Sequence, residues 1–214
     1  MRTRVKVCGI TSMSDGLAAA QLGADAIGLI FYPPSPRRVT LGQACEIVSC
    51  LPPFVARIAV FVNPDAAKVA AVIDASRPDF LQFHGEEAPD FCRGFGVPYL
   101  KAVRMRQDLD LLEYLSPFHD AAGWLLDAYH ADLYGGTGEG FDWEMVPPRL
   151  ERPVVLSGGL APGNVVEAIR RVRPWAVDVS SGVESAKGVK DERLIAAFIA
   201  GVRDADENLS QRST

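Results

Sequence analysis

Apolar residues fall into short runs that alternate with longer stretches of helical periodicity along the chain. The runs are rich in β-branched and aromatic residues and stop at glycine or polar residues, which is typical of strands. Eight strands are predicted, at Val5–Gly9, Ala26–Phe31, Ile58–Val62, Phe80–His84, Leu100–Arg104, Trp124–Ala128, Val154–Ser157 and Ala176–Ser180. Helices are predicted between them, at Ser12–Leu22, Leu41–Leu51, Asp65–Ala75, Ala88–Phe95, Asp108–Leu115 and Pro162–Val172, and a last helix, Asp191–Val202, closes the chain. Only the sixth connection is weak, with Gly135–Gly140 in place of most of a helix.

Strict alternation of strand and helix predicts a parallel sheet. Eight units favour a single-domain α/β fold, the (β/α)8 TIM barrel, over residues 1–203, with an open doubly wound sheet as the alternative. Many of the predicted strands end in polar or glycine-containing groups. All these ends meet at one face of a barrel, whereas an open sheet would use only the strands beside its switch point, so the barrel is favoured. Residues 204–214 are polar without an apolar period and are predicted to form a disordered tail.

Composition narrows the possible functions. The chain of 214 residues is 48% apolar and 23% charged, with a net charge of −5, as in ordinary soluble proteins. No basic run points to nucleic acid, and no apolar stretch approaches the roughly 18 residues of a membrane span. We therefore expect a cytoplasmic protein with neither nucleic-acid nor membrane partners. Its four cysteines form no CxxC pair or zinc-spaced cluster, so no metal site is expected.

The first predicted strand carries an unusual pair of side chains. Strand residues alternate between faces, so Lys6 and Cys8 share one face and Val5 and Val7 share the other. The valines suit packing against a helix, which leaves the lysine and cysteine facing the barrel interior. A nearby cation favours a thiolate that can act as base or nucleophile, although a lone cysteine is more often a small buried hydrophobe.

Two aspartates and two other polar residues also lie near strand ends. Asp127 follows three apolar residues and is a candidate general acid, or alternatively a cap of the next loop. Asp178 has the same placement and could equally bind backbone amides. Gln82 and His84 share one face of the fourth strand, where they line a pocket or form hydrogen-bonded core groups; both interpretations stay open. Of the three histidines, only His84 ends a predicted strand.

Two kinds of anion site are predicted. Glycine clusters follow strands six, seven and eight, where backbone N–H groups can bind a phosphate, although each cluster alone could merely form a turn. The predicted phosphate-binding residues are Gly136, Gly138, Ser157, Gly158, Gly159, Ser181 and Gly182. Arg37 lies in the proline-rich loop after the second strand and could grip a carboxylate with its guanidinium.

These segments occur together in a specific order. They are Lys6–Thr11 (KVCGIT), Ser35–Arg37, Gln82–Gly85, Leu126–Asp127, Gly135–Trp143 (GGTGEGFDW), Leu156–Leu160 and Asp178–Glu184. The set resembles the signature of the phosphoribosylanthranilate isomerase family of tryptophan biosynthesis and covers nearly the whole chain. Phe83, where the family more often has leucine, is a small departure on the face opposite the pocket.

The resemblance implies a (β/α)8 barrel that performs an Amadori rearrangement on a small phosphorylated substrate. It implies that Asp127 is the general acid, that Cys8 is the general base, and that Arg37 grips the anthranilate carboxylate. The glycine clusters match the family's phosphate site. No metal or organic cofactor is expected. An ordinary thiol has a pKa of about 8.5 and an ordinary aspartate about 3.9, so we expect the site to lower the first and raise the second.

Rival functions remain at this point. An aldolase would need a Schiff-base lysine, for which Lys6 and Lys101 are the candidates. A metal-dependent epimerase would need more inward histidines than three histidines can supply. A barrel that binds a phosphorylated ligand without turnover is the non-enzyme alternative, against which Cys8 and Asp127 speak.

Overall fold

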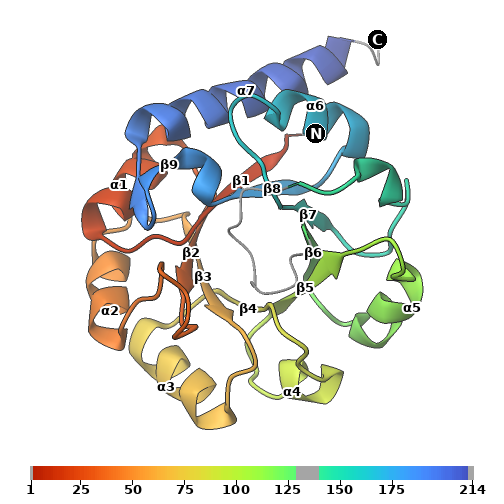
Figure 1. The fold of residues 1–214 in the computed structure, drawn as a ribbon. Helices are drawn as coiled ribbons and strands as arrows, with labels where there is room; N and C mark the ends of the chain where they lie inside the picture. The colour runs from red at the N-terminus through yellow and green to blue at the C-terminus, as the bar shows by residue number, and fades with distance from the viewer. Residues whose placement is uncertain (1, 129–139, 212–214) are drawn as a thin grey trace.

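The computed structural model, which describes residues 2–128 and 140–211, is a closed parallel barrel with helices around its outside (Figure 1). Its strands are β1 (Arg4–Cys8), β2 (Ala26–Ile30), β3 (Ala56–Phe61), β4 (Phe80–Phe83), β5 (Tyr99–Met105), β6 (Gly123–Ala128), β7 (Val154–Leu156) and β8 (Ala176–Val179). Each strand pairs with the next, and β8 closes on β1. The predicted (β/α)8 barrel is thus confirmed, and the open sheet is excluded.

The helices follow the predicted order, with local signals that explain where they begin. They are α1 (Met13–Leu22), α2 (Leu41–Ser49), α3 (Ala66–Ser76), α4 (Pro89–Arg93), α5 (Leu111–Leu115), α6 (Val165–Val172) and α7 (Glu192–Gln211). Ser12 and Asp65 cap α1 and α3 by accepting backbone hydrogen bonds, and Thr40 with Gln43 forms a capping box at α2. Short 3-10 helices lie at η1 (Ser116–Phe118), η2 (Trp143–Met145) and η3 (Ser181–Val183).

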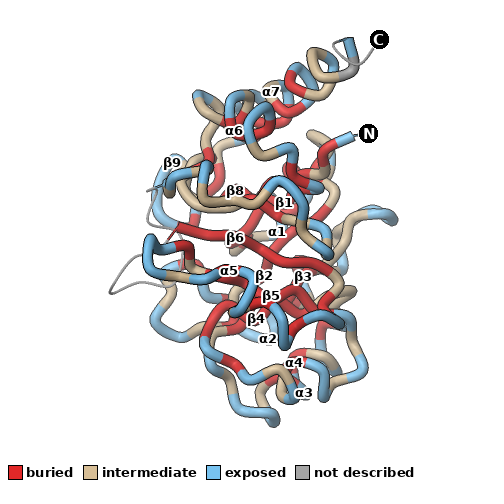
Figure 2. The backbone as a smooth tube through the Cα atoms, turned by 90° about the vertical axis from the view of Figure 1, so that its right-hand side faces the viewer, coloured by how far each residue is buried: buried red, intermediate tan, exposed pale blue. Residues whose placement is uncertain are grey.

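Alternation along the strands separates two cores. Val5 and Val7 belong to the large apolar layer between the barrel and its helices. Cys8 instead packs inside the barrel with Ala26, Ile58 and other interior residues, as the alternation predicted. Figure 2 shows these strands as the most buried part of the chain, with exposed segments at the outer loops and helices.

The expected disordered tail is largely helix. Helix α7 continues to Gln211, so residues 204–211 are ordered, which corrects the prediction for that segment. Val202 and Ala205 are buried, and Asp206 accepts two hydrogen bonds of 2.7 Å from the backbone and hydroxyl groups of Thr3. The apolar residues of this last stretch recur at helical spacing but are few among charged neighbours, so the sequence pattern alone does not indicate the helix.

A small hairpin after β8 was not predicted. Strands β9 (Glu184–Ala186) and β10 (Val189–Lys190) pair antiparallel around a tight turn. The turn residue Gly188 has a φ of 80°, a conformation that glycine adopts without strain. The Thr11 hydroxyl donates a 2.6 Å hydrogen bond to the Gly188 carbonyl. This contact holds the hairpin against the loop that follows β1, at the mouth of the barrel.

Candidate active site

A small cavity of about 50 Å³ opens at the carboxyl ends of the strands, where barrel enzymes carry their sites. The six side chains predicted for catalysis and substrate binding all line it: Cys8, Arg37, Gln82, His84, Asp127 and Asp178. The same wall includes Ser157, a predicted phosphate-binding residue. Tyr32 and Ser180 also line the cavity, although nothing in the sequence pattern predicted a role for either of them.

The base candidate sits in a buried, charged corner. Lys6 Nζ lies 2.9 Å from Asp178 Oδ2, and both side chains are almost fully buried. Gly28 on the neighbouring strand leaves room for the sulfur, because a Cβ there would lie 2.6 Å from Cys8 Sγ. Burial lowers the pKa of Lys6, but the nearby Asp178 and Cys8 together raise it above its ordinary value. Lys6 is therefore a fixed cation.

The thiol itself does not follow the sequence-based expectation. Burial raises the pKa of Cys8 above its ordinary value, and Asp178 adds to the rise, while the Lys6 ammonium opposes both. The expectation that the site lowers this pKa is wrong for the protein without ligand, because desolvation outweighs the cation. Cys8 consequently carries its proton at neutral pH in the free protein.

The acid candidate belongs to a chain of three buried side chains. Gln82 Nε2 lies 2.8 Å from His84 Nδ1, and His84 Nε2 lies 3.0 Å from Asp127 Oδ2. Gln82 and His84 are therefore both cavity-lining and hydrogen-bonded to each other, so the two interpretations left open by the sequence are both correct in part. Their partner is Asp127, a contact that the sequence did not reveal because 43 residues separate it from His84.

Arg37 is held in place by a hairpin residue. Its Nε and Nη2 donate to the two carboxylate oxygens of Glu184 at 2.7 and 2.8 Å. Lys190 Nζ donates to the same carboxylate at 2.8 Å and to the Ser180 carbonyl at 3.0 Å. Gly9, with a φ of 75°, lies under Arg37, where a Cβ would meet its Cδ at 2.6 Å. The sequence predicted that Arg37 holds a ligand's carboxylate by two hydrogen bonds. In this structure the carboxylate of Glu184 accepts two hydrogen bonds from Arg37 in that way.

The charged groups of this cluster shift one another's pKa values. Hydrogen bonds to Glu184 raise the pKa of Arg37. Burial opposes ionisation of Glu184, but hydrogen bonds from Arg37 and Lys190 outweigh it and hold its pKa below the ordinary value. Burial lowers the pKa of Lys190, with Glu184 offsetting part of the effect. Two cations share one carboxylate, so the cluster keeps one net positive charge near the cavity.

The predicted phosphate loops come together after β7 and β8. Gly158 and Gly159 have φ values of 85° and 63°, and a Cβ at Gly158 would lie 2.5 Å from the Ala128 backbone nitrogen. Among the described residues, the N–H groups of Gly159, Ser181 and Gly182 have no acceptor, so they are available to an anion. Gly136 and Gly138, the other predicted phosphate residues, lie outside the described residues.

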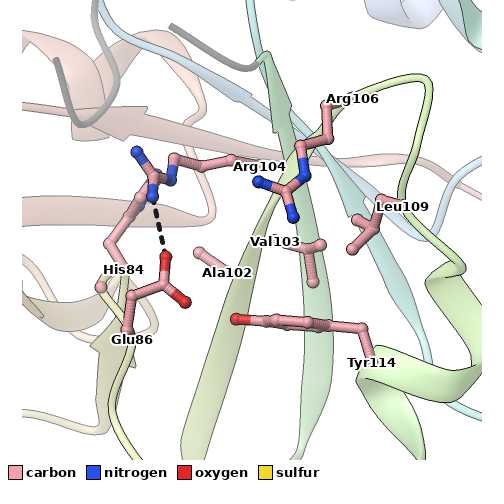
Figure 3. Close-up of a pocket in the computed structure, with 9 residues that line it drawn as sticks. His84, Glu86, Ala102, Val103, Arg104, Arg106, Leu109 and Tyr114 are labelled. Carbon is pink, nitrogen blue, oxygen red and sulfur yellow. Dashed lines mark hydrogen bonds and ion pairs between the residues drawn. The ribbon is translucent and has the colours of Figure 1, made fainter. Parts of the chain in front are cut away.

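A second hollow shares His84 with the first. It lies over the ends of β4 and β5, where the Arg106 side chain points towards the ring of Tyr114 and the Arg104 side chain points towards Glu86 (Figure 3). Arg104 Nη2 donates to Glu86 Oε1 at 2.7 Å. Burial raises the pKa of Tyr114 to about 12, and Glu86 contributes in the same direction. This hollow adjoins the acid end of the cavity.

The aldolase alternative loses one of its two candidate lysines. The Lys101 side chain is fully buried, and its Nζ donates to the Gly85 carbonyl at 2.6 Å and to Glu87 Oε2 at 2.8 Å. Its ammonium also lies 5.3 Å from the Phe118 ring centroid, in the layer outside the barrel. Lys101 is a structural ion pair away from the cavity and is unsuited to form a Schiff base there.

Within residues 2–128 and 140–211, no three His, Cys, Asp or Glu side chains are grouped so as to hold a metal ion. The same residues contain no helix long and apolar enough to cross a membrane.

Known proteins resemble this chain over almost its full length. A family model described as N-(5'phosphoribosyl)anthranilate (PRA) isomerase matches residues 5–201. The N-(5'-phosphoribosyl)anthranilate isomerase of Nitrosospira multiformis is 54% identical over 202 residues, covering 94% of this chain and 97% of that protein. The corresponding enzyme of Nitrosomonas europaea is 52% identical over 207 residues, covering 97% and 98%.

Solved structures agree with the sequence relatives. The phosphoribosyl anthranilate isomerase from Thermotoga maritima superposes with a TM-score of 0.87 at 41% identity, covering 94% of this chain and 99% of that one. A phosphoribosyl anthranilate isomerase in complex with reduced 1-(o-carboxyphenylamino)-1-deoxyribulose 5-phosphate gives a TM-score of 0.84 at 40% identity, again covering 94% and 99%.

Proposed function

Because the chain belongs to the N-(5'-phosphoribosyl)anthranilate isomerase family, we propose that Cys8 is the general base and Asp127 the general acid of its reaction. The protein catalyses the Amadori rearrangement of N-(5-phosphoribosyl)anthranilate to 1-(2-carboxyphenylamino)-1-deoxyribulose 5-phosphate in tryptophan biosynthesis. The observation that carries the assignment is that Cys8 and Asp127 reach one cavity from separate strands, β1 and β6.

The two groups suffice for the proton transfers of the rearrangement. Asp127 gives a proton to the furanose ring oxygen as the bond from that oxygen to C1 breaks, and the amino nitrogen's lone pair forms the iminium. Cys8 acts in its thiolate form, which it reaches by losing the proton that it carries at neutral pH. The thiolate removes the C2 proton, and the electron pair of that bond moves into C1–C2 to give an enolamine. Loss of the C2 hydroxyl proton and protonation at C1 complete the ketone.

The substrate carries an anion at each end, so it needs two anchors. We assign the phosphate to the loops after β7 and β8, where backbone N–H groups without an acceptor among the described residues suit an anion. We assign the anthranilate carboxylate to Arg37, supported by the net positive charge that Arg37 and Lys190 keep beside Glu184. Since Glu184 already occupies Nε and Nη2 of Arg37, the remaining N–H donors of the guanidinium would bind the carboxylate.

The reaction does not require a metal or organic cofactor in this proposal. The substrate's own nitrogen stabilises both the iminium and the enolamine, which leaves an acid, a base and orientation for the protein to supply. Activity that survives exhaustive dialysis against a chelator supports this view, and activity restored only by an added ion contradicts it. A cytosolic location and independence of an obligate protein partner also stay proposals, to be tested by cell fractionation and by activity of the purified chain.

The direct test follows the loss of fluorescence of freshly generated substrate in variants of the two residues. Cys8→Ala and Asp127→Asn should each lower kcat by about 10²–10⁴-fold, because each removes a proton-transfer group. Cys45→Ala and Asp90→Asn are matched controls, since Cys45 lies outside the cavity lining and the Asp90 side chain is 94% exposed. Either active-site variant retaining more than about a tenth of kcat would remove that residue from its role.

A further inference from the structure

The acid candidate is connected to two polar side chains whose proton positions depend on one another. Asp127, His84 and Gln82 are all buried, with exposed fractions of 4%, 8% and 1%. His84 bridges the other two through its two ring nitrogens. An imidazole nitrogen either donates or accepts, so the group facing Nδ1 determines which form of His84 the protein holds.

The orientation of the Gln82 amide in the structure corresponds to an Asp127 carboxylate without its proton. Gln82 presents its NH2 group to Nδ1, so Nδ1 accepts and the proton of the neutral ring is on Nε2. Nε2–H then donates to Asp127 Oδ2, and that oxygen holds no proton. An Asp127 that protonates the substrate needs the opposite arrangement, with the proton on the carboxyl group or shared with Nε2.

The opposite arrangement requires only a half-turn of one amide. If Gln82 presents Oε1 to Nδ1, the ring carries Nδ1–H and Nε2 can share a second proton with Asp127. Gln82 Oε1 is buried and has no hydrogen-bond partner among the described residues, so no bond on that side holds the amide in its present orientation. The half-turn exchanges nitrogen and oxygen in the same space, because the two ends of an amide have nearly equal size.

We propose that His84 is a positioning residue that keeps a proton available to Asp127, and that Gln82 selects the loaded state by turning Oε1 towards His84 Nδ1. This inference rests on the proposed role of Asp127. In this loaded state His84 and Asp127 together hold two protons, one on His84 Nδ1 and one shared between His84 Nε2 and Asp127 Oδ2. The second passes through Asp127 to the ring oxygen, and the pair recovers a proton when the C2 hydroxyl is deprotonated later in the cycle.

Other charged groups around the cavity also act on His84 and Asp127. Arg104 lies beside Asp127 in the β5–β6 register and is paired with Glu86. The other charged and titratable groups that line the cavity or contact its lining residues are Tyr32, Lys6, Cys8, Arg37, Asp178, Glu184 and Lys190. Arg106 and Tyr114 line the hollow that shares His84, and the ion pair of Glu87 and Lys101 lies away from the cavity. Variants of Gln82 leave all of these charges in place.

Two substitutions at Gln82 separate the proposal from a structural role. Gln82→Glu offers only acceptor oxygens, so it favours Nδ1–H and the loaded state. Gln82→Met has similar length but no strong acceptor. We expect Gln82→Glu to keep at least about tenfold more kcat than Gln82→Met, and the alkaline limb of its pH profile to lie at higher pH. A purely structural role gives the reverse order, since a buried carboxylate is costlier than a thioether.

A third variant tests His84 itself. His84→Gln can donate to Asp127 but cannot hold a second proton, so we expect kcat to fall by about tenfold or more, with KM changed less than about threefold. His119→Gln is the matched control, because His119 is exposed and does not line the cavity. A rise in KM with kcat unchanged would overturn the proposal and return His84 to substrate binding.

The unmodified protein gives an independent measurement. It contains three histidines, so ¹⁵N-histidine labelling yields three rings, and the His84→Gln variant identifies the signal of His84. We expect Nδ1 of His84 to be protonated at the pH of maximal kcat. A pyridine-type Nδ1 throughout the active pH range would overturn the proposal even if Asp127→Asn were inactive. An active Asp127→Asn variant would instead remove the premise, so the two failures are distinguishable.

Discussion

Removing the Glu184 carboxylate should destabilise the fold more than any other single charge change at the cavity mouth. Glu184 accepts three short hydrogen bonds from two cations, Arg37 and Lys190, and all three side chains are nearly buried. Truncating one partner of a buried pair leaves uncompensated charge and typically costs 3–5 kcal/mol. Water that enters the space left by the truncation would screen the two cations, so we expect about 3 kcal/mol for Glu184→Ala.

Urea unfolding is the appropriate assay. With a slope of about 2–3 kcal/mol per molar, a loss of about 3 kcal/mol lowers the midpoint by about 1 M at unchanged slope. Glu184→Gln keeps one acceptor oxygen and should cost about 1–3 kcal/mol. Glu144→Ala is the control, because Glu144 is exposed and its Arg171 contact is long at 3.9 Å, so its midpoint should not move. A Glu184→Ala midpoint equal to that of the control would refute the reasoning.

The pH dependence of that difference has a definite sign. The pKa of Glu184 is lower in the folded protein than in the unfolded chain, because the hydrogen bonds from Arg37 and Lys190 outweigh burial. Its contribution to stability is therefore fully present above the unfolded pKa of about 4.3 and is lost as pH falls towards the folded value. The stability gap between the wild type and Glu184→Gln should stay constant from pH 7 to pH 5 and shrink below about pH 4.3.

Three further outcomes follow from the site. Because burial raises the pKa of Cys8, kcat/KM should increase as pH rises above neutrality. Lys6→Met should move that increase to still higher pH. A flat profile of kcat/KM between pH 7 and 9 would contradict a buried thiol base. Arg37→Ala should raise KM more than Arg37→Lys, and Arg38→Ala should raise it less than either, so steady-state kinetics that reverse this order would show that the wrong arginine was chosen. Inorganic phosphate should compete with the substrate, and an anion found at the opposite barrel face and not near Ser181 would overturn the phosphate assignment.

The barrel and the placement of its inward residues were predictable because they depend on local periodicity. Cys8 was assigned to the interior from a period of two, and the structure places it there with Ala26 and Ile58. Asp127 was likewise found from its position near the end of a strand, and Arg37 from its position in the loop after one. Predictions of this kind do not require knowing which strands pair with one another.

The partners of these residues were not predictable. Arg37 and Glu184 are 147 residues apart, and nothing in either local pattern selects the other. The β9–β10 hairpin is too short for a periodic signal, so Lys190 was missed with it. The pKa of Cys8 was misjudged for a related reason: its proximity to Lys6 is local, but the depth of its burial depends on the whole barrel.

The ion pairs at the barrel mouth also bear on the order in which the chain can fold during synthesis. The buried cations of β1 and of the loop after β2, Lys6 and Arg37, both have their carboxylates in the segment from Asp178 to Glu184. A nascent chain that lacks this segment has two cations that it cannot bury without a counterion. The amino-terminal strands should therefore remain loosely packed on the ribosome until the last strand emerges, and the mouth of the barrel should close in one late, cooperative step.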